Sequence, residues 1–209
     1  MRMINHHPGR VSATLLGLLP FLLIMLIYSL ASQERLAENP NDKLLPGLEQ
    51  MTAAVERMAF QEDRRSGDYL MVQDTTASLA RLGMGVGIAA LLALVVGILN
   101  GVLPLVRANL APLVSALSMV PPLAILPILF IVFGLGELSK VMLIVIGTAP
   151  IMMRDVAQRV RELPGEQLIK IQTLGANSWQ VITRMALPQV LPRLIDAVRL
   201  SLGPAWLFL

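Results

Sequence analysis

Few side chains in this sequence have the type and spacing that chemistry requires. His6 and His7 are adjacent near the N-terminus, but no third ligand follows at a suitable spacing, so we interpret them as part of a solvated tail. Asp196 has Arg193 and Arg199 three residues away on either side, which favours ion pairs along one helical face over a proton relay. We therefore predict no catalytic residue and no metal site.

The residue types and motifs that the sequence lacks exclude several classes of chemistry. The chain has no cysteine, which excludes disulfides, thiolate nucleophiles and cysteine-based metal centres. It also has no phosphate-binding loop of the form Gly-x4-Gly-Lys-Ser/Thr, so any ATP that drives it must be bound by another chain. We expect neither an enzyme nor a cofactor.

The composition indicates a membrane as the solvent. Hydrophobic residues make up 55% of the 209 residues and charged residues only 15%. A soluble domain does not need so much apolar surface to bury one core, so we predict an integral membrane protein in contact with lipid and with no nucleic-acid partner.

Candidate spans are the apolar segments 11–30, 82–106, 110–135 and 141–153. About 20 helical residues cross the roughly 30 Å hydrocarbon core, and the last segment spans only if it begins near Leu138. The first segment follows a tail, 1–10, and resembles a signal peptide, but we favour a retained helix because no convincing cleavage site follows. Apolar residues 201–209 begin a fifth span, in which the sequence looks truncated.

Polar connectors set the orientation of these spans. The segment 31–74 is acidic overall, whereas the N-terminal tail, the turn at Arg107 and the segment 154–184 are basic. The positive-inside rule therefore places the N-terminus and the 154–184 loop in the cytoplasm. Glu137 and Lys140 are expected to mark a short turn outside.

Residues after Pro46 and Gly47 repeat apolar side chains at helical spacing. This pattern predicts a short amphipathic helix at the membrane surface or against the bundle. A solvated connector without such a role is the alternative.

Glycines recur in the second span and prolines in the third. Two small-residue motifs, Gly83-x-x-x-Gly87 and Gly97-x-x-x-Gly101, would let helices approach closely. The third span is expected to be kinked or broken and to face the bundle interior or a translocation pathway, because it contains four prolines: Pro112 and the pathway candidates Pro121, Pro122 and Pro127.

The segment 163–192 predicts two short helices that meet at a glycine. The first covers about Gly165 to Leu174, and Gly175 can adopt the left-handed conformation that ends a helix. Asn177 or Ser178 can cap the second helix, which we expect to run to Leu187 and to stop at Pro188.

This segment resembles the cytoplasmic signature of bacterial ATP-binding-cassette (ABC) importer permeases. That signature has Glu-Ala-Ala, three residues, Gly, nine residues and Ile-x-Leu-Pro, and here Gly175 precedes Met185-Ala186-Leu187-Pro188 by nine residues. The Glu-Ala-Ala positions fall on Ile169, Lys170 and Ile171 and do not match. Thr173-Leu174-Gly175-Ala176, and the Pro121-Pro122 pair upstream, are similar to the nitrate, sulfonate and taurine branch.

The resemblance implies an all-α polytopic transmembrane helix bundle of the type I importer class in the bacterial inner membrane. Its permease core would be 75–209, with coupling helices at about 163–188. The implied partners are cytoplasmic ABC ATPase subunits, an extracytoplasmic substrate-binding protein and a second permease copy, and the implied substrate is a small solute such as nitrate, a sulfonate or taurine. Residues expected to couple to the ATPase are Leu174, Gly175, Ala176, Trp179, Leu187 and Pro188.

Two other classes of protein compete with this interpretation. A membrane-embedded enzyme would need ionisable residues clustered inside the spans, and only Arg107 lies between 82–106 and 110–135. A passive channel or membrane scaffold without an ATPase partner is the stronger rival, although it would not need the Gly175 to Pro188 segment.

Overall fold

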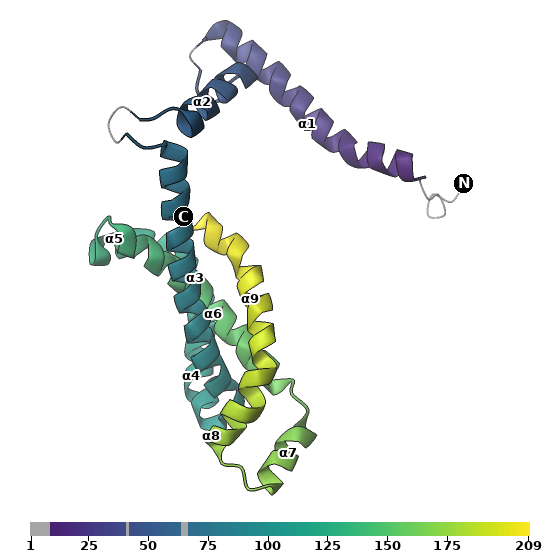
Figure 1. The fold of residues 1–209 in the computed structure, drawn as a ribbon, viewed down its shortest axis with the longest axis vertical. Coiled ribbons are helices and arrows are strands. Elements are labelled where there is room, and N and C mark those ends of the chain that lie inside the picture. The colour runs from purple at the N-terminus through teal and green to yellow at the C-terminus, as the bar shows by residue number, and fades with distance from the viewer. Residues whose placement is uncertain (1–8, 41, 64–66) are drawn as a thin grey trace. The chain divides into compact units, whose positions relative to one another are not determined.

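The computed structural model describes residues 9–40, 42–63 and 67–209 and divides the chain into two compact units, Met1–Gln73 and Asp74–Leu209 (Figure 1). His6, His7 and most of the predicted 1–10 tail lie outside the described residues. Across the described ranges the regular structure is helical, apart from one isolated antiparallel bridge between Glu62 and Tyr69. The predicted all-α class is confirmed.

In its described residues the first unit contains α1 (Arg10–Glu38), α2 (Leu48–Phe60) and the first residues of α3. Helix α1 extends eight residues beyond the predicted apolar segment, and the predicted amphipathic helix after Gly47 is present as α2. The Tyr28 hydroxyl donates to the Pro46 carbonyl at 2.8 Å, and these two elements are thereby tied together through their connector.

The connector between α1 and α2 is also ordered by a carboxylate. The Leu44 backbone N–H donates to Asp42 at 2.9 Å, and Arg35 forms an ion pair with the same side chain. The pKa of Asp42 is lowered from its usual value, mainly by the hydrogen bond from the Leu44 backbone N–H and next by the hydrogen bond from the Arg35 guanidinium.

The second unit is built on α3, α6 and α9, which run side by side (Figure 1). Hydrophobic residues from all three helices form its core, and α6 is the most enclosed of the apolar helices. In chain order the elements are α3 (Leu70–Val102), α4 (Pro104–Leu117), η2 (Pro122–Ile125), α5 (Leu126–Phe133), α6 (Glu137–Arg161), α7 (Gly165–Thr173), α8 (Ser178–Gln180), η3 (Val181–Ala186) and α9 (Leu187–Leu207).

Among the described residues, three helices are long and apolar enough to cross a membrane: α1, α3 and α6. The pair formed by α4 and η2 with α5 passes the same test but is bent by 82°, so it is a broken span or a re-entrant loop. The expected break in the proline-rich third segment is confirmed. Pro121 and Pro122 stand at the bend, since η2 begins at Pro122.

A stripe of small residues on α3 allows α3 and α6 to pack closely. Its members are buried and four residues apart: Gly85, Ala89, Ala93, Gly97 and Gly101. A Cβ built on Gly97 would lie 2.7 Å from Cβ of Val156 and 3.0 Å from the Met153 carbonyl oxygen, so only glycine fits against α6 there.

The prediction from the glycine motifs is half correct. Gly97 and Gly101 pack against α6 as expected, but Gly83 and Gly87 are exposed and a Cβ on either would meet nothing within 4 Å. Each residue turns an α-helix by about 100°, so a residue two positions from Gly85 lies on the opposite face. The inward small residue in this part of α3 is Gly85.

The predicted end of the second span and the predicted turn at Glu137 and Lys140 are wrong. Helix α3 ends at Val102 rather than near residue 106, because Pro104 starts the next helix and Leu103 before it is extended. Glu137 and Lys140 do not form a turn; they lie in the first turn of α6, after a turn in which Gly134 has a φ of +78°.

The fourth span is also longer than predicted, because α6 continues through Arg161 instead of yielding to a loop at Arg154. The final turns remain amphipathic. Val156 and Val160 are buried, while Arg159 on another face lies 3.6 Å from the Asp155 carboxylate. Ion pairs four residues apart lie on one exposed face of a helix, so the last turns of α6 can extend beyond the apolar region.

We predict that Gly97→Ala destabilises the second unit whereas Gly87→Ala does not. The added methyl at position 97 overlaps Val156, and overpacking of this kind costs about 1–3 kcal/mol. At the open position 87 the same change gains up to about 1 kcal/mol of helix propensity. Thermal unfolding of the purified variants in one detergent measures the difference, and equal midpoints would contradict the close packing of α3 on α6.

Candidate functional site

The two short helices predicted around Gly175 are present and are joined by a tight helix end. Helix α7 stops at Thr173, and Gly175 has a φ of +83°, which confirms the expected left-handed conformation. The Ala176 N–H donates to the Ile171 carbonyl at 3.2 Å and the Gly175 N–H donates to the Gln172 carbonyl at 2.9 Å. This pair of bonds is the Schellman arrangement, which satisfies carbonyls at the end of α7.

The next helix begins with a reciprocal cap. The Asn177 side-chain oxygen accepts from the Gln180 backbone N–H at 2.9 Å, and the Gln180 side-chain oxygen accepts from the Asn177 backbone N–H at 2.9 Å. Of the two predicted caps, the structure uses Asn177. Both ends of the turn are therefore fixed by local hydrogen bonds, which defines the angle between α7 and α8.

The prediction that Pro188 stops the second helix is wrong. The π-helical segment η3 follows α8, and α9 then continues to Leu207 with Pro188 in its first turn. In η3 the Leu187 N–H donates to the Ile182 carbonyl, five residues back. In a regular α-helix a proline lacks the N–H for the i to i−4 hydrogen bond, and its ring clashes with the carbonyl four residues back. The wider π-helical turn comes directly before Pro188, so the helix can continue through the proline.

Helix α7 is joined to the rest of the second unit by a side-chain hydrogen bond, and a hollow lies between α7 and the bundle. The Gln189 amide donates to the Gln167 side-chain oxygen at 3.0 Å and to the Met185 carbonyl at 3.1 Å. A hollow of about 390 Å³ separates α7 from the bundle, with Leu168 on one wall and Val181 on another.

The predicted coupling residues divide into outward and inward groups. Leu174 and Trp179 are 79% and 68% exposed, whereas Ala176 and Leu187 are half-buried. Beneath them, the η3 residues Val181, Met185 and Ala186 are buried against the unit. The element therefore shows apolar side chains on its outer surface while its base is part of the core.

The predicted pathway residues lie at the bend between α4 and α5. Pro121 and Pro127 are exposed and Pro122 is half-buried. The ring of Pro122 approaches α6 so closely that a Cβ on Gly147 would lie 3.0 Å from it. These prolines lie together at the bend, which is distant from the Gly175 element along the chain and in the fold.

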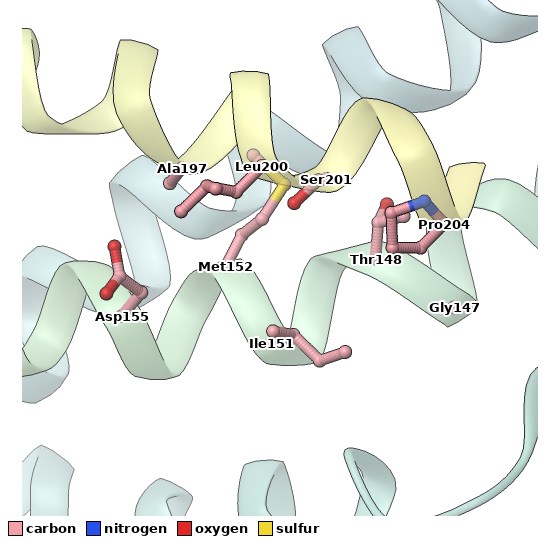
Figure 2. Close-up of a pocket in the computed structure, with 9 residues that line it drawn as sticks. All are labelled: Gly147, Thr148, Ile151, Met152, Asp155, Ala197, Leu200, Ser201 and Pro204. Carbon is pink, nitrogen blue, oxygen red and sulfur yellow. The ribbon is translucent and has the colours of Figure 1, made fainter. Parts of the chain in front are cut away.

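A groove between α6 and α9 was not anticipated from the sequence. Figure 2 shows its lining side chains, with Asp155 at one end and Thr148 and Pro204 at the other. The groove has a volume of about 180 Å³ and is mostly apolar. The Thr148 hydroxyl donates to the Ile144 carbonyl at 2.7 Å, so it is already committed to its own helix.

Ionisable groups do not assemble a catalytic or metal centre in the described part of the chain. No cluster of three or more potential metal ligands occurs there. Arg193 and Asp196 form the expected pair at 3.9 Å, but both side chains are more than 60% exposed, so the pair contributes little. The geometry defines a helical membrane protein with an exposed helix-turn-helix at one end of its bundle.

Comparison with known proteins identifies the family. Residues 85–209 match the model of the binding-protein-dependent transport system inner membrane component, and the chain belongs to this family. Its members are transport subunits of the inner membrane and not enzymes. The recognition of an ABC importer permease from the Gly175 to Pro188 segment is confirmed.

Three curated relatives are similar over different lengths. The taurine transport system permease protein of Escherichia coli (strain K12) is 37% identical over 140 residues, 66% of this chain and 50% of the relative. The bicarbonate transport system permease protein of Synechococcus elongatus is 30% identical over 198 residues, 92% of this chain and 68% of the relative. A putative aliphatic sulfonates transport permease protein of Bacillus subtilis (strain 168) is 33% identical over 130 residues, 62% of this chain and 47% of the relative. The chain therefore spans about half to two thirds of the length of these relatives.

We predict that Asn177→Ala loosens the start of α8 whereas Asn177→Asp does not. Alanine removes the acceptor for the Gln180 N–H, and losing such a cap costs about 1 kcal/mol. Hydrogen exchange at the Gln180 amide should then be about fivefold faster. Aspartate retains an acceptor oxygen, so its exchange rate should stay near that of the native chain. Equal rates for all three chains would show that the cap does not hold this helix.

Proposed function

We propose that this chain is the transmembrane permease subunit of an ATP-driven importer and that its α7–α8 element couples it to a separate ABC ATPase. The observation that carries the proposal is the exposure of Leu174 and Trp179 on a helix-turn-helix whose base is buried in the bundle. Exposed apolar side chains on a short helix fit a groove on a soluble partner.

Movement of the ATPase would reach the spans through continuous helix. The chain runs from α8 through η3 into α9 without a loop, and the buried residues Met185, Ala186 and Val190 lie on the path. Val190 and Ala186 belong to the same hydrophobic cluster as Val156 of α6. A displacement of α8 therefore acts on α9 and α6, and their tilting would alternate access to the pathway.

The substrate we propose is a small anion or zwitterion. The relatives are named for taurine, bicarbonate and aliphatic sulfonates, which are all small polar solutes with a negatively charged group. The pathway would be completed by a second copy of the chain, with Pro121, Pro122 and Pro127 at its wall. Substrate would arrive from an extracytoplasmic binding protein.

The proposed topology keeps the sequence-based orientation. The N-terminus and the α7–α8 element would lie in the cytoplasm, 11–30 would be the first span, and 31–74 would be the extracytoplasmic connector that contains α2. The permease core would be 75–209, and its coupling helices would lie at about 163–188. The net basic charge of the segment 154–184, which covers the last turns of α6 and the α7–α8 element, supports this orientation.

We predict that Leu174→Asp abolishes co-purification with the ATPase encoded beside the gene. A carboxylate in an apolar groove is costly because it must lose its hydration there. Leu44→Asp is the matched control, since Leu44 is 75% exposed and lies in the connector between α1 and α2. Co-purification in mild detergent measures the complex. Failure of the native chain to bind any ATPase would favour the passive channel or scaffold.

We further predict that Gly175→Val stops transport without removing the chain from the membrane. A β-branched residue is strained at a φ of +83°, so the turn between α7 and α8 would open. Gly165→Val is the control, because Gly165 begins α7 with ordinary helical geometry and open space around it. Uptake by cells that express each variant, normalised to membrane content, reports the effect. Native uptake by Gly175→Val would refute the role of this turn.

A further inference from the structure

A second hollow, lined by arginines, lies where α3 ends between α4 and α6. It has a volume of about 190 Å³ and is more polar than the groove between α6 and α9. Its polar lining comprises Asn100, Arg107, Ser115, Arg154, Gln158 and Arg161. Arg107 and Arg161 also line the hollow beside α7, so the two spaces are neighbours.

Hydrogen bonds hold two of the three guanidinium groups in place. Arg107 donates to the Asn100 carbonyl at 3.2 Å and to the Gly101 carbonyl at 2.8 Å, which satisfies the end of α3. Arg154 donates to the Ser118 hydroxyl at 2.8 Å. These bonds fix the positions of the groups and leave further N–H donors on each guanidinium, which carries five.

The three arginines form no ion pair in the described part of the chain, although carboxylates are close in sequence. Asp155 and Glu162 instead contact Arg159, at 3.6 and 3.4 Å. Three like charges around a small space repel one another unless an opposite charge enters it. The lining therefore has an excess of positive charge and fixed donors.

Asn100 provides independent evidence of a missing partner. The residue is only 4% exposed, it lines the hollow, and its amide oxygen has no hydrogen-bond partner among the described residues. Buried side-chain polar atoms in native proteins are nearly always paired. The amide can present either its oxygen or its N–H₂ group to the hollow, so it can complement a hydroxyl or an anionic oxygen.

We propose that this hollow binds an oxyanion group, a sulfonate, carboxylate or phosphate, between Arg107, Arg154 and Arg161, with Asn100 as a fourth contact. Planar guanidinium groups match such groups with paired hydrogen bonds. The oxyanion is either a free solute or the headgroup of an anionic lipid, which share this chemistry. The site does not depend on the coupling role of α7–α8, but its occupancy would act on the adjoining wall of the α7 hollow.

The test uses the full chain and two probes, one in nanodiscs and one in detergent. In phosphatidylcholine nanodiscs, methanesulfonate is titrated at constant ionic strength against chloride, and the thermal midpoint is recorded. In detergent, native mass spectrometry measures retained phosphatidylglycerol. The variants are the double change Arg154→Gln with Arg161→Gln, and Asn100→Asp, which places a carboxylate in the hollow and keeps all three arginines.

The control is Arg159→Gln, which removes one positive charge from α6, against two in the double variant, at a group already paired with carboxylates. We expect saturable stabilisation or lipid retention with the native chain and with Arg159→Gln. Both test variants should weaken it by about tenfold or more, because the double variant loses charge-assisted hydrogen bonds to the anion and Asn100→Asp places a like charge beside it.

Each outcome decides the proposal. Stabilisation by methanesulfonate that both test variants lose identifies a free oxyanion, and phosphatidylglycerol retention that they lose identifies a lipid headgroup. The proposal is overturned if the native chain responds to neither probe. It is also overturned if Arg159→Gln weakens binding as much as the test variants, because general surface charge would then explain the effect. The Asn100→Asp variant keeps the test valid if the double variant does not fold.

Discussion

Close contact between α3 and α6 is the constraint on which the second unit depends. Inside a bilayer, lipid tails are as apolar as leucine, so helices associate through packing rather than through exclusion of water. The buried stripe of glycine and alanine on α3 lets Val156 and Ile144 of α6 approach its backbone. With α6 held there, α9 packs on the core that α3 and α6 share, and the groove, the bend at Pro122 and the base of η3 all lie against α6.

The α7–α8 element shows how a membrane protein can offer a defined surface to a soluble partner. Its shape is set locally, by the left-handed Gly175 and by the reciprocal cap of Asn177 and Gln180. Its attachment is set by the core, through Val181 and Met185. Because the shape does not depend on a partner, the proposed docking to an ATPase would lose little ordering entropy, and a movement of the ATPase would be transmitted to the bundle.

Features governed by local chemistry were predictable from the sequence, and features governed by tertiary contacts were not. Gly175 and Asn177 act through bonds to residues within five positions, so the helix end and the cap could be foreseen. The predicted stop at Pro188 is wrong because the chain changes helix type in η3 and continues into α9, which the local sequence does not indicate. The inward position of Gly85, rather than Gly83, depends on where α6 lies, and the arginine hollow joins residues from three helices.

The π-helical segment gives the chain a sensitivity to length as well as to residue type. A π-helical turn holds one residue more than an α-helical turn, so η3 sets the rotational phase of everything that follows. The inward positions of α9, which include Ala197, Ser201 and Ala205, face the core only in that phase. Gaining one residue in η3 would rotate α9 by about 100° and put Asp196 at the inward position of Ala197, whereas losing one would rotate it the other way and put Val198 there. In this chain a substitution within η3 keeps the phase of α9, whereas an insertion or a deletion changes it.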